Sequence, residues 1–142
     1  MSKVILTYGT FDLFHIGHLH LLERARALGH RLIVGVSTDE FNSVKGKKTF
    51  IDFSQRIEIV RSLRCVDAVF PESCWAQKRA DVAKYNVDTF IMGSDWTGKF
   101  DFLKDQCEVL YLPRTEGISS TELRIRIAVQ NAVQRQQLHE VF

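Results

Sequence analysis

Residues 4–36 read VILTYGTFDLFHIGHLHLLERARALGHRLIVGV, and this stretch decides the fold. Its two ends, residues 4–8 and 31–36, are short apolar runs rich in β-branched side chains, which predict strands. Between them, apolar residues recur at helical spacing over residues 17–28, and Gly29 suits a helix C-cap. A strand, a helix and a second strand in this order predict a parallel βαβ unit.

The same alternation continues along the chain. Further helices are predicted over residues 53–63 and 75–85 and from residue 119 or 120 onward, and further strands over residues 66–70, 87–92 and 108–112. Nearly continuous apolar runs are typical of strands that helices cover on both faces. We therefore expect an α/β fold, a single-domain three-layer sandwich with a five-stranded parallel sheet.

No linker, repeat or low-complexity block divides the chain, so we expect one domain over residues 1–130 and a C-terminal tail over residues 131–142. The tail, from about Gln130, is itself Gln-rich and only loosely periodic. Two interpretations stay open for it: a frayed helix end, or a helix that packs on a partner.

Composition excludes several classes of protein. The 142 residues carry a net charge of only +2, which argues against a dedicated nucleic-acid binder. No apolar run reaches the roughly 18 residues that a membrane span needs, so we expect no membrane insertion. The three cysteines are odd in number and form no C-x-x-C pair, which argues against a disulfide framework and favours the cytoplasm.

The densest polar cluster follows the first strand, over residues 9–18. Gly9 allows a ligand to approach the backbone, and His15 and His18 straddle the predicted start of a helix, where free N–H groups favour an anion. An alternative is that one histidine caps the helix while the other packs beneath a loop. A zinc site is disfavoured because no cysteine stands at metal-ligand spacing, and we assign no metal to protein side chains.

Two more loops belong at the same edge of a parallel sheet, where ligands bind beyond the carboxyl ends of the strands. Residues 45–48 read KGKK, either a phosphate-binding loop or a solvated surface loop. Residues 113–121 combine Arg114, a glycine turn and the capping box that begins at Ser119, and all three suit a phosphate. Dinucleotide and P-loop glycine fingerprints are absent from the sequence.

The segments GTFD (9–12), HIGH (15–18) and RTEGISS (114–120) resemble the signature motifs of the cytidylyltransferases, with similarity from residue 3 to about 128. The resemblance implies a Rossmann-like fold and, with Mg²⁺, the reaction of CTP with sn-glycerol 3-phosphate to give CDP-glycerol and pyrophosphate. It further implies a homodimer and a product that serves a glycerol-phosphate polymer such as teichoic acid or capsule.

The resemblance also implies roles for individual residues. Catalysis is expected from His15, His18, Lys47 and Arg114. Nucleotide binding is expected from these four and from Gly9, Thr10, Phe11, Gly17, Asp95, Thr115, Gly117, Ile118, Ser119, Ser120 and Thr121. Binding of glycerol 3-phosphate is expected from Lys45 and Lys78, with Trp75, Arg56 and Arg64 beside them. The alternatives are a cytidylyltransferase for another alcohol phosphate, an adenylyltransferase of the same superfamily, and a nucleotide-binding module without turnover.

Overall fold

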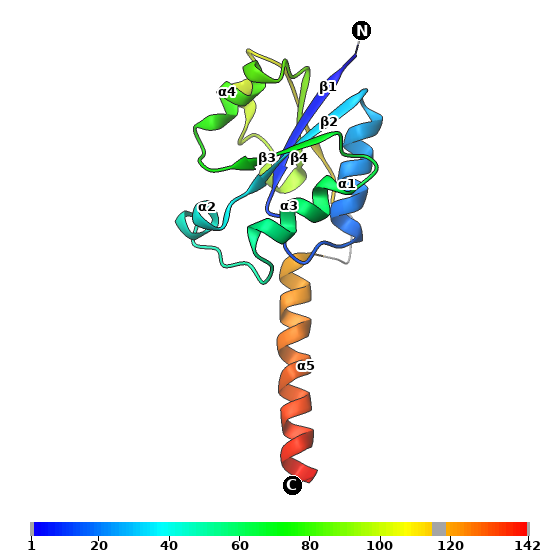
Figure 1. The fold of residues 1–142 in the computed structure, drawn as a ribbon, viewed down its shortest axis with the longest axis vertical. Helices are drawn as coiled ribbons and strands as arrows, with labels where there is room; N and C mark the ends of the chain where they lie inside the picture. The colour runs from blue at the N-terminus through cyan, green and yellow to red at the C-terminus, as the bar shows by residue number, and fades with distance from the viewer. Residues whose placement is uncertain (1, 115–118, 142) are drawn as a thin grey trace.

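The computed structural model describes residues 2–114 and 119–141. Its elements in chain order are β1 (Val4–Gly9), α1 (Ile16–Ala27), β2 (Arg31–Ser37), α2 (Asp39–Val44), α3 (Phe53–Arg61), β3 (Ala68–Glu72), α4 (Gln77–Lys84), β4 (Thr89–Gly93), the 3₁₀ helices η1 (Ser94–Trp96) and η2 (Asp101–Leu103), β5 (Glu108–Leu112) and α5 (Ser120–Val141). All strand pairs are parallel, in the order β3-β2-β1-β4-β5. The predicted five-stranded parallel sheet is confirmed (Figure 1).

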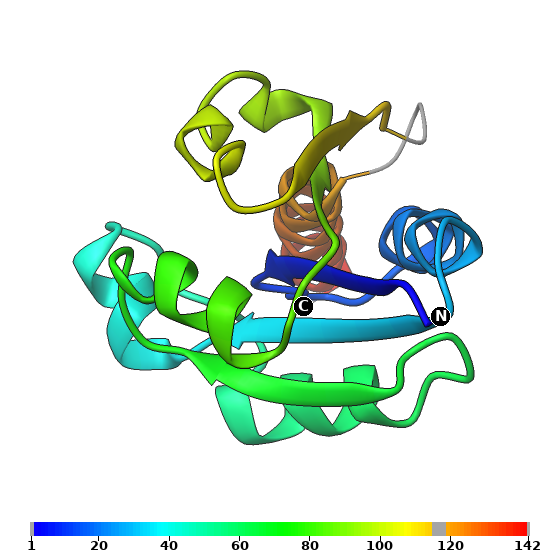
Figure 2. The same cartoon turned by 90° about the horizontal axis from the view of Figure 1, so that it is seen from above.

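Helices cover both faces of the sheet because the strands alternate two apolar sets. Ile5 belongs to a core shared with α1 and α3, whereas the next residue, Leu6, belongs to a core shared with α4 and η2. Figure 2 shows α3 and α4 on opposite sides of β3. One core lies on each face of the sheet, between the strands and the helices, and the three layers form the predicted sandwich.

The strand order reverses between β1 and β4. These two strands pair only over Ile5↔Thr89 and Leu6↔Phe90, although both continue toward their carboxyl ends. In open α/β sheets, ligands bind at such a reversal. The loops that leave β1 and β4 therefore border the expected site.

Several elements differ from the prediction. Strand β4 begins at Thr89 rather than at residue 87, and α3 ends at Arg61 rather than at residue 63. Helix α2 was not predicted, because its six residues are too few to show helical periodicity. Strand β3 begins at Ala68 rather than at Val66, whose backbone amide bonds back to Leu63 and closes the turn after α3. Helix α4 begins at Gln77, whose side chain accepts hydrogen bonds from the two backbone amides at residues 73 and 74 and holds that segment as a loop.

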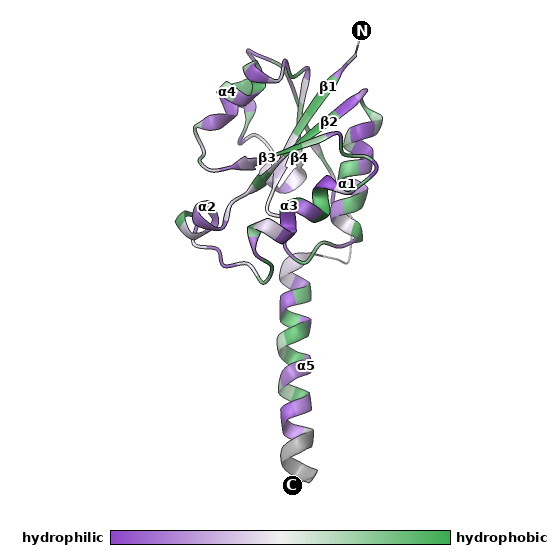
Figure 3. Cartoon of the chain, viewed as in Figure 1, coloured by the Kyte–Doolittle hydropathy of each residue, from purple (hydrophilic) through white to green (hydrophobic). Residues whose placement is uncertain are grey.

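Helix α5 projects away from the sandwich (Figure 1). It continues through the predicted tail to Val141, and hydrophobic residues are concentrated in its first half (Figure 3). Ile125 is 59% exposed and Val129 is 57% exposed. Within residues 2–114 and 119–141, no helix combines the length and apolar character that a bilayer span requires.

Candidate active site

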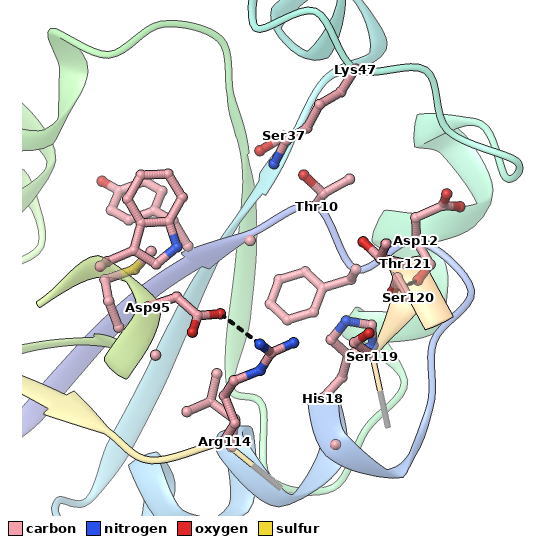
Figure 4. Close-up of a pocket in the computed structure, with 18 of the residues that line it drawn as sticks. Thr10, Asp12, His18, Ser37, Lys47, Asp95, Arg114, Ser119, Ser120 and Thr121 are labelled. Carbon is pink, nitrogen blue, oxygen red and sulfur yellow. Dashed lines mark hydrogen bonds and ion pairs between the residues drawn. The ribbon is translucent and has the colours of Figure 1, made fainter. Parts of the chain in front are cut away.

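A cavity of about 370 Å³ lies beyond the carboxyl ends of the strands. Loops after β1, β4 and β5, the start of α5 and the residues around Lys45 surround it (Figure 4). The position agrees with the strand reversal between β1 and β4.

The loop after β1 is held in an uncommon backbone conformation. Phe11 and Leu13 have positive φ angles of 56° and 48°, which cost free energy for residues other than glycine. The Asp12 carboxylate between them accepts hydrogen bonds from the backbone amides of Leu13, Phe50 and Ile51. Asp12 thereby fixes this loop against the segment that follows the lysines.

Asp12 also binds helix α5. Its carboxylate lies 2.5 Å from Arg124 Nη2, and the Ser120 hydroxyl donates to its backbone carbonyl at 2.6 Å. Burial raises the pKa of Asp12, but the Phe50 amide and the Arg124 guanidinium lower it by more, so the net pKa is below its usual value. The carboxylate is therefore charged at neutral pH and joins three segments of the pocket wall.

Gly9 is required by close packing at the end of β1. A Cβ atom at this position would lie 2.7 Å from the Phe11 ring, which is closer than side chains approach. Phe11 itself is buried and packs edge-on against the His18 ring, with centroids 5.5 Å apart. Gly9 thus sets the place of Phe11, and Phe11 supports His18.

The two histidines form a reciprocal cap at the start of α1. His15 Nδ1 accepts from the backbone amide of Gly17 at 3.0 Å, and His18 Nδ1 accepts from the backbone amide of His15 at 3.2 Å. In a neutral imidazole whose Nδ1 accepts, the proton resides on Nε2. His15 Nε2 is buried and has no hydrogen-bond partner among the described residues.

Both histidines are neutral at physiological pH. Burial and the neighbouring His15 lower the pKa of His18 to about 3. Burial and the positive charge of Arg114 lower the pKa of His15. The two rings stack with centroids 3.9 Å apart. A positive charge on one ring therefore disfavours protonation of the other. The cap therefore presents two neutral Nε2–H donors, and the two sequence interpretations of these histidines are compatible.

Arg114 and the start of α5 line the cavity beside His18 (Figure 4). Arg114 Nη1 lies 3.4 Å from the Asp95 carboxylate, and both side chains are more than half exposed. The Ser119 hydroxyl accepts from the backbone amide of Glu122 at 3.1 Å, which confirms half of the predicted capping box. A helix N-terminus and a guanidinium therefore border the same space.

The lysine loop supplies two ammonium groups to the cavity wall. Gly46 has a φ of 74°, a conformation that glycine adopts freely, and it turns the chain between Lys45 and Lys47. Lys47 points into the cavity (Figure 4). Lys45 is half-buried, with Nζ 4.4 Å from the centroid of the Phe41 ring. Burial lowers the pKa of Lys45 to about 8, against the opposing charge of Glu72.

A second set of charged groups lies at the ends of β2 and β3. Lys78, on α4, is 1% exposed, and its Nζ is 2.5 Å from the Glu72 carboxylate. The Ser37 hydroxyl donates to the other Glu72 oxygen at 2.6 Å. Trp75 borders this end, with Lys78 Nζ 4.9 Å from the centroid of its ring.

The structure brings most of the predicted site residues to one cavity. Its wall includes Gly9, Thr10, Phe11, His15, Gly17, His18, Lys45, Lys47, Trp75, Lys78, Asp95, Arg114, Ser119, Ser120 and Thr121. Thr115, Gly117 and Ile118 lie outside the described residues.

Two predicted substrate-binding residues are not on the cavity wall. Arg56 is 1% exposed, and its guanidinium donates to the backbone carbonyls of Ile51 and Thr10 and to the Asp39 carboxylate. Arg64 is exposed and precedes β3, at the amino end of the sheet. Arg56 is a buried structural cation, and Arg64 lies on the side of the sheet away from the cavity.

Sequence reasoning missed several wall residues, namely Tyr8, Ser37, Glu72, Trp96 and Arg124. Ser37 and Glu72 are the last residues of β2 and β3, so the strand-end rule that found the other loops applies to them as well. Arg124 lies two residues beyond the capping box at residues 119–122, just past the free amides of α5.

Comparison with known proteins identifies a family that agrees with the geometry of this site. A family model described as cytidylyltransferase-like matches residues 6–126. The chain belongs to the cytidylyltransferase-like family. Among curated members, the glycerol-3-phosphate cytidylyltransferase of Bacillus subtilis (strain 168) is 57% identical over 126 residues, covering 89% of this chain and 98% of that protein. The Staphylococcus aureus (strain NCTC 8325 / PS 47) protein of the same name is 57% identical over 122 residues, covering 86% and 92%.

Solved structures support the family assignment at the level of fold. The lipopolysaccharide core biosynthesis protein from Thermoplasma volcanium GSS1 superposes with a TM-score of 0.69 at 21% identity, over 82% of this chain and 100% of that chain. This likeness concerns the fold alone. It agrees with the Rossmann-like architecture that the cytidylyltransferase motifs imply.

Proposed function

We propose that the protein transfers CMP from CTP to sn-glycerol 3-phosphate and releases CDP-glycerol and pyrophosphate. The observation that carries the proposal is the composition of one cavity, which has paired histidine donors at one end and two lysines at the other. The 57% identity to glycerol-3-phosphate cytidylyltransferases supports the choice of both substrates.

The two ends of the cavity suit two different phosphates. We assign the triphosphate to the end with His15, His18, Arg114 and the start of α5, where donors and positive charge converge. We assign the acceptor phosphate to the end with Lys45 and Lys78. Lys47 lies on the wall of the same cavity and is available to the nucleotide.

The reaction requires no protein base. A phosphate monoester has a second pKa near 6, so its oxygen is largely deprotonated at neutral pH and attacks the α-phosphorus of CTP directly. The bond from that phosphorus to the bridging oxygen breaks, and pyrophosphate leaves with the electron pair. The Nε2–H groups of His15 and His18 and the Arg114 guanidinium stabilise the charge that develops there.

We further propose that Mg²⁺ accompanies CTP. Three carboxylates of the cavity wall are engaged, since Asp12 contacts Arg124, Asp95 contacts Arg114 and Glu72 contacts Lys78. Among the described residues, no group of three or more His, Cys, Asp or Glu side chains is placed to hold a metal. Mg²⁺ is commonly held by substrate phosphates and water, where it offsets their negative charge.

Pyrophosphate release tests the proposal. The wild-type protein with Mg²⁺ is offered each of the four ribonucleoside triphosphates together with glycerol 3-phosphate, phosphoethanolamine, phosphocholine or ribitol 5-phosphate. We expect release with CTP and glycerol 3-phosphate only. Release with CTP and a different acceptor would replace the acceptor and keep the mechanism, whereas ATP in place of CTP would indicate an adenylyltransferase. CTP binding without release under any condition would support a binding module.

We also propose a homodimer that works in the cytoplasm and supplies CDP-glycerol for glycerol-phosphate polymers such as teichoic acid or capsule. The exposed aliphatic side chains of α5 favour self-association, and the three free cysteines suit a reducing compartment. Sedimentation velocity at micromolar concentration tests the oligomeric state. A monomer at all concentrations would contradict the dimer.

A further inference from the structure

Glu72 is a buried carboxylate for which the proposed reaction has no role. It is the last residue of β3, is 3% exposed, and stands in register with Ser37, the last residue of β2. Burying a carboxylate is costly unless charged or polar partners compensate it. Its contacts therefore indicate what it does.

The contacts form one continuous chain between two ammonium groups. Lys78 Nζ donates to one Glu72 oxygen at 2.5 Å, and the Ser37 hydroxyl donates to the other at 2.6 Å. Lys45 Nζ in turn donates to Ser37 Oγ at 3.3 Å. The Glu72 carboxylate and the Ser37 hydroxyl thus fix the positions of both lysine ammonium groups.

Each lysine also needs this support, because its surroundings are largely aromatic. Lys78 Nζ lies 4.6 Å from the Tyr8 ring centroid and 4.9 Å from the Trp75 ring centroid. Lys45 Nζ lies over the Phe41 ring. A lysine stem has four rotatable bonds and many rotamers, and a buried ammonium without a counter-charge loses its proton or moves to water.

We propose that Glu72 is a positioning residue that holds Lys45 and Lys78 as one clamp for the phosphate of the acceptor. This inference rests on the proposed function and deepens it. Two ammonium groups and one carboxylate leave a single net positive charge, with lysine N–H groups not used by Glu72 available to a dianionic phosphate. Glu72 acts through the lysines and does not touch the substrate.

A double-mutant cycle tests this role. Steady-state KM values for glycerol 3-phosphate and for CTP are measured in the wild type, Glu72→Gln, Lys78→Met and the double variant. We expect Glu72→Gln to raise KM for glycerol 3-phosphate about tenfold or more, while KM for CTP stays within about twofold. In the Lys78→Met background, Glu72→Gln should cause little further rise in KM for glycerol 3-phosphate, because the lysine that Glu72 contacts directly is already gone.

Ser37→Ala provides a second variant if Glu72→Gln does not fold. It removes only the hydroxyl that links Lys45 to Glu72, and it too should raise KM for glycerol 3-phosphate and not KM for CTP. Asp67→Asn is the control. The Asp67 carboxylate also has a cationic partner, Arg26 at 3.2 Å, but Asp67 precedes β3 at the amino end of the sheet and is not part of the cavity wall, so its change should leave both KM values near the wild type.

Three results would overturn the positioning role. They are a lower melting temperature with both KM values unchanged, an equal rise in both KM values, or an undiminished effect of Glu72→Gln in the Lys78→Met background. If the wild type turns over CTP and glycerol 3-phosphate normally, these results reject only the inference. A wild type that neither turns over nor binds glycerol 3-phosphate by calorimetry rejects the proposed function and the inference together.

Discussion

The Nδ1 atom of His18 accepts a hydrogen bond from the backbone amide of His15 at 3.2 Å. The proton of the neutral His18 ring is therefore on Nε2, and Nε2–H is a hydrogen-bond donor. Because burial lowers the pKa of His18 to about 3, the ring stays neutral from pH 5 to 8. We expect kcat/KM for CTP to show no histidine limb near pH 6.5. His18→Ala should lower kcat by more than about 100-fold, as for a donor to developing charge.

His18→Gln separates a neutral donor from a proton carrier, because a glutamine amide donates but does not titrate. It should recover part of the activity that His18→Ala loses, and its pH profile should have the same shape as that of the wild type. His30→Ala is the control, since His30 is exposed and bonds to Lys3 at the other end of the sheet. Near-normal turnover of folded His18→Ala would contradict the assigned role.

Lys45 gives the acceptor end a pH dependence. With its pKa lowered to about 8, Lys45 is charged below that pH and neutral above it. The acceptor phosphate gains its second negative charge above about pH 6. We therefore expect kcat/KM for glycerol 3-phosphate to rise through pH 6, to be highest between the two values, and to fall above pH 8.

Lys45→Arg tests the basic limb, because an arginine stays protonated throughout this range. We expect the decline above pH 8 to disappear even if the maximum is lower. Lys48→Arg is the matched control from the same loop, as Lys48 is exposed and is not part of the cavity wall. A basic limb that remains unchanged in Lys45→Arg would assign it to another group.

The fold was predictable because it follows from local patterns. Apolar runs and helical spacing are properties of neighbouring residues, and within the part of the chain that the structure describes they located all five strands and four of the five α-helices. Helix α2 escaped because its stability depends on a Thr38 cap and on two side chains, Phe41 and Asn42, buried by tertiary contacts. Such contacts leave little signal in six residues.

The roles of individual charged residues were less predictable, because pairing partners are distant in sequence. Arg56 bonds to the Thr10 carbonyl, 46 residues away, and this contact makes it a structural residue. Glu72 meets Ser37, 35 residues away, only because β2 and β3 pair in this register. The two histidines and Arg114 lie on the cavity wall, where a short segment fixes the position of each, and their catalytic roles stay predictions.

Asp12 should contribute to stability through charge. Asp12→Asn weakens the contact with Arg124, whose Nε is buried without a partner among the described residues, so we expect a loss of about 2–4 kcal/mol in the free energy of unfolding. Because the pKa of Asp12 is lowered by folding, its contribution is complete above the unfolded value of about 4 and is lost on acidification. Urea unfolding at pH 7 and pH 3 should therefore show a smaller difference between variant and wild type at the lower pH. An equal difference at both values would mean that the charge is not responsible.

Gly9 and Gly93 end neighbouring strands, and they should differ in their tolerance of a methyl group. A Cβ atom at Gly9 would lie 2.7 Å from the Phe11 ring, whereas one at Gly93 would have no atom within 4 Å. Gly9→Ala must displace Phe11, which supports His18, so we expect a loss of about 1–3 kcal/mol in stability together with a lower kcat. Gly93→Ala, which has an ordinary φ of −66°, should leave the melting temperature unchanged. Thermal unfolding of both variants tests the comparison, and equal melting temperatures would show that the Phe11 ring moves aside at no cost.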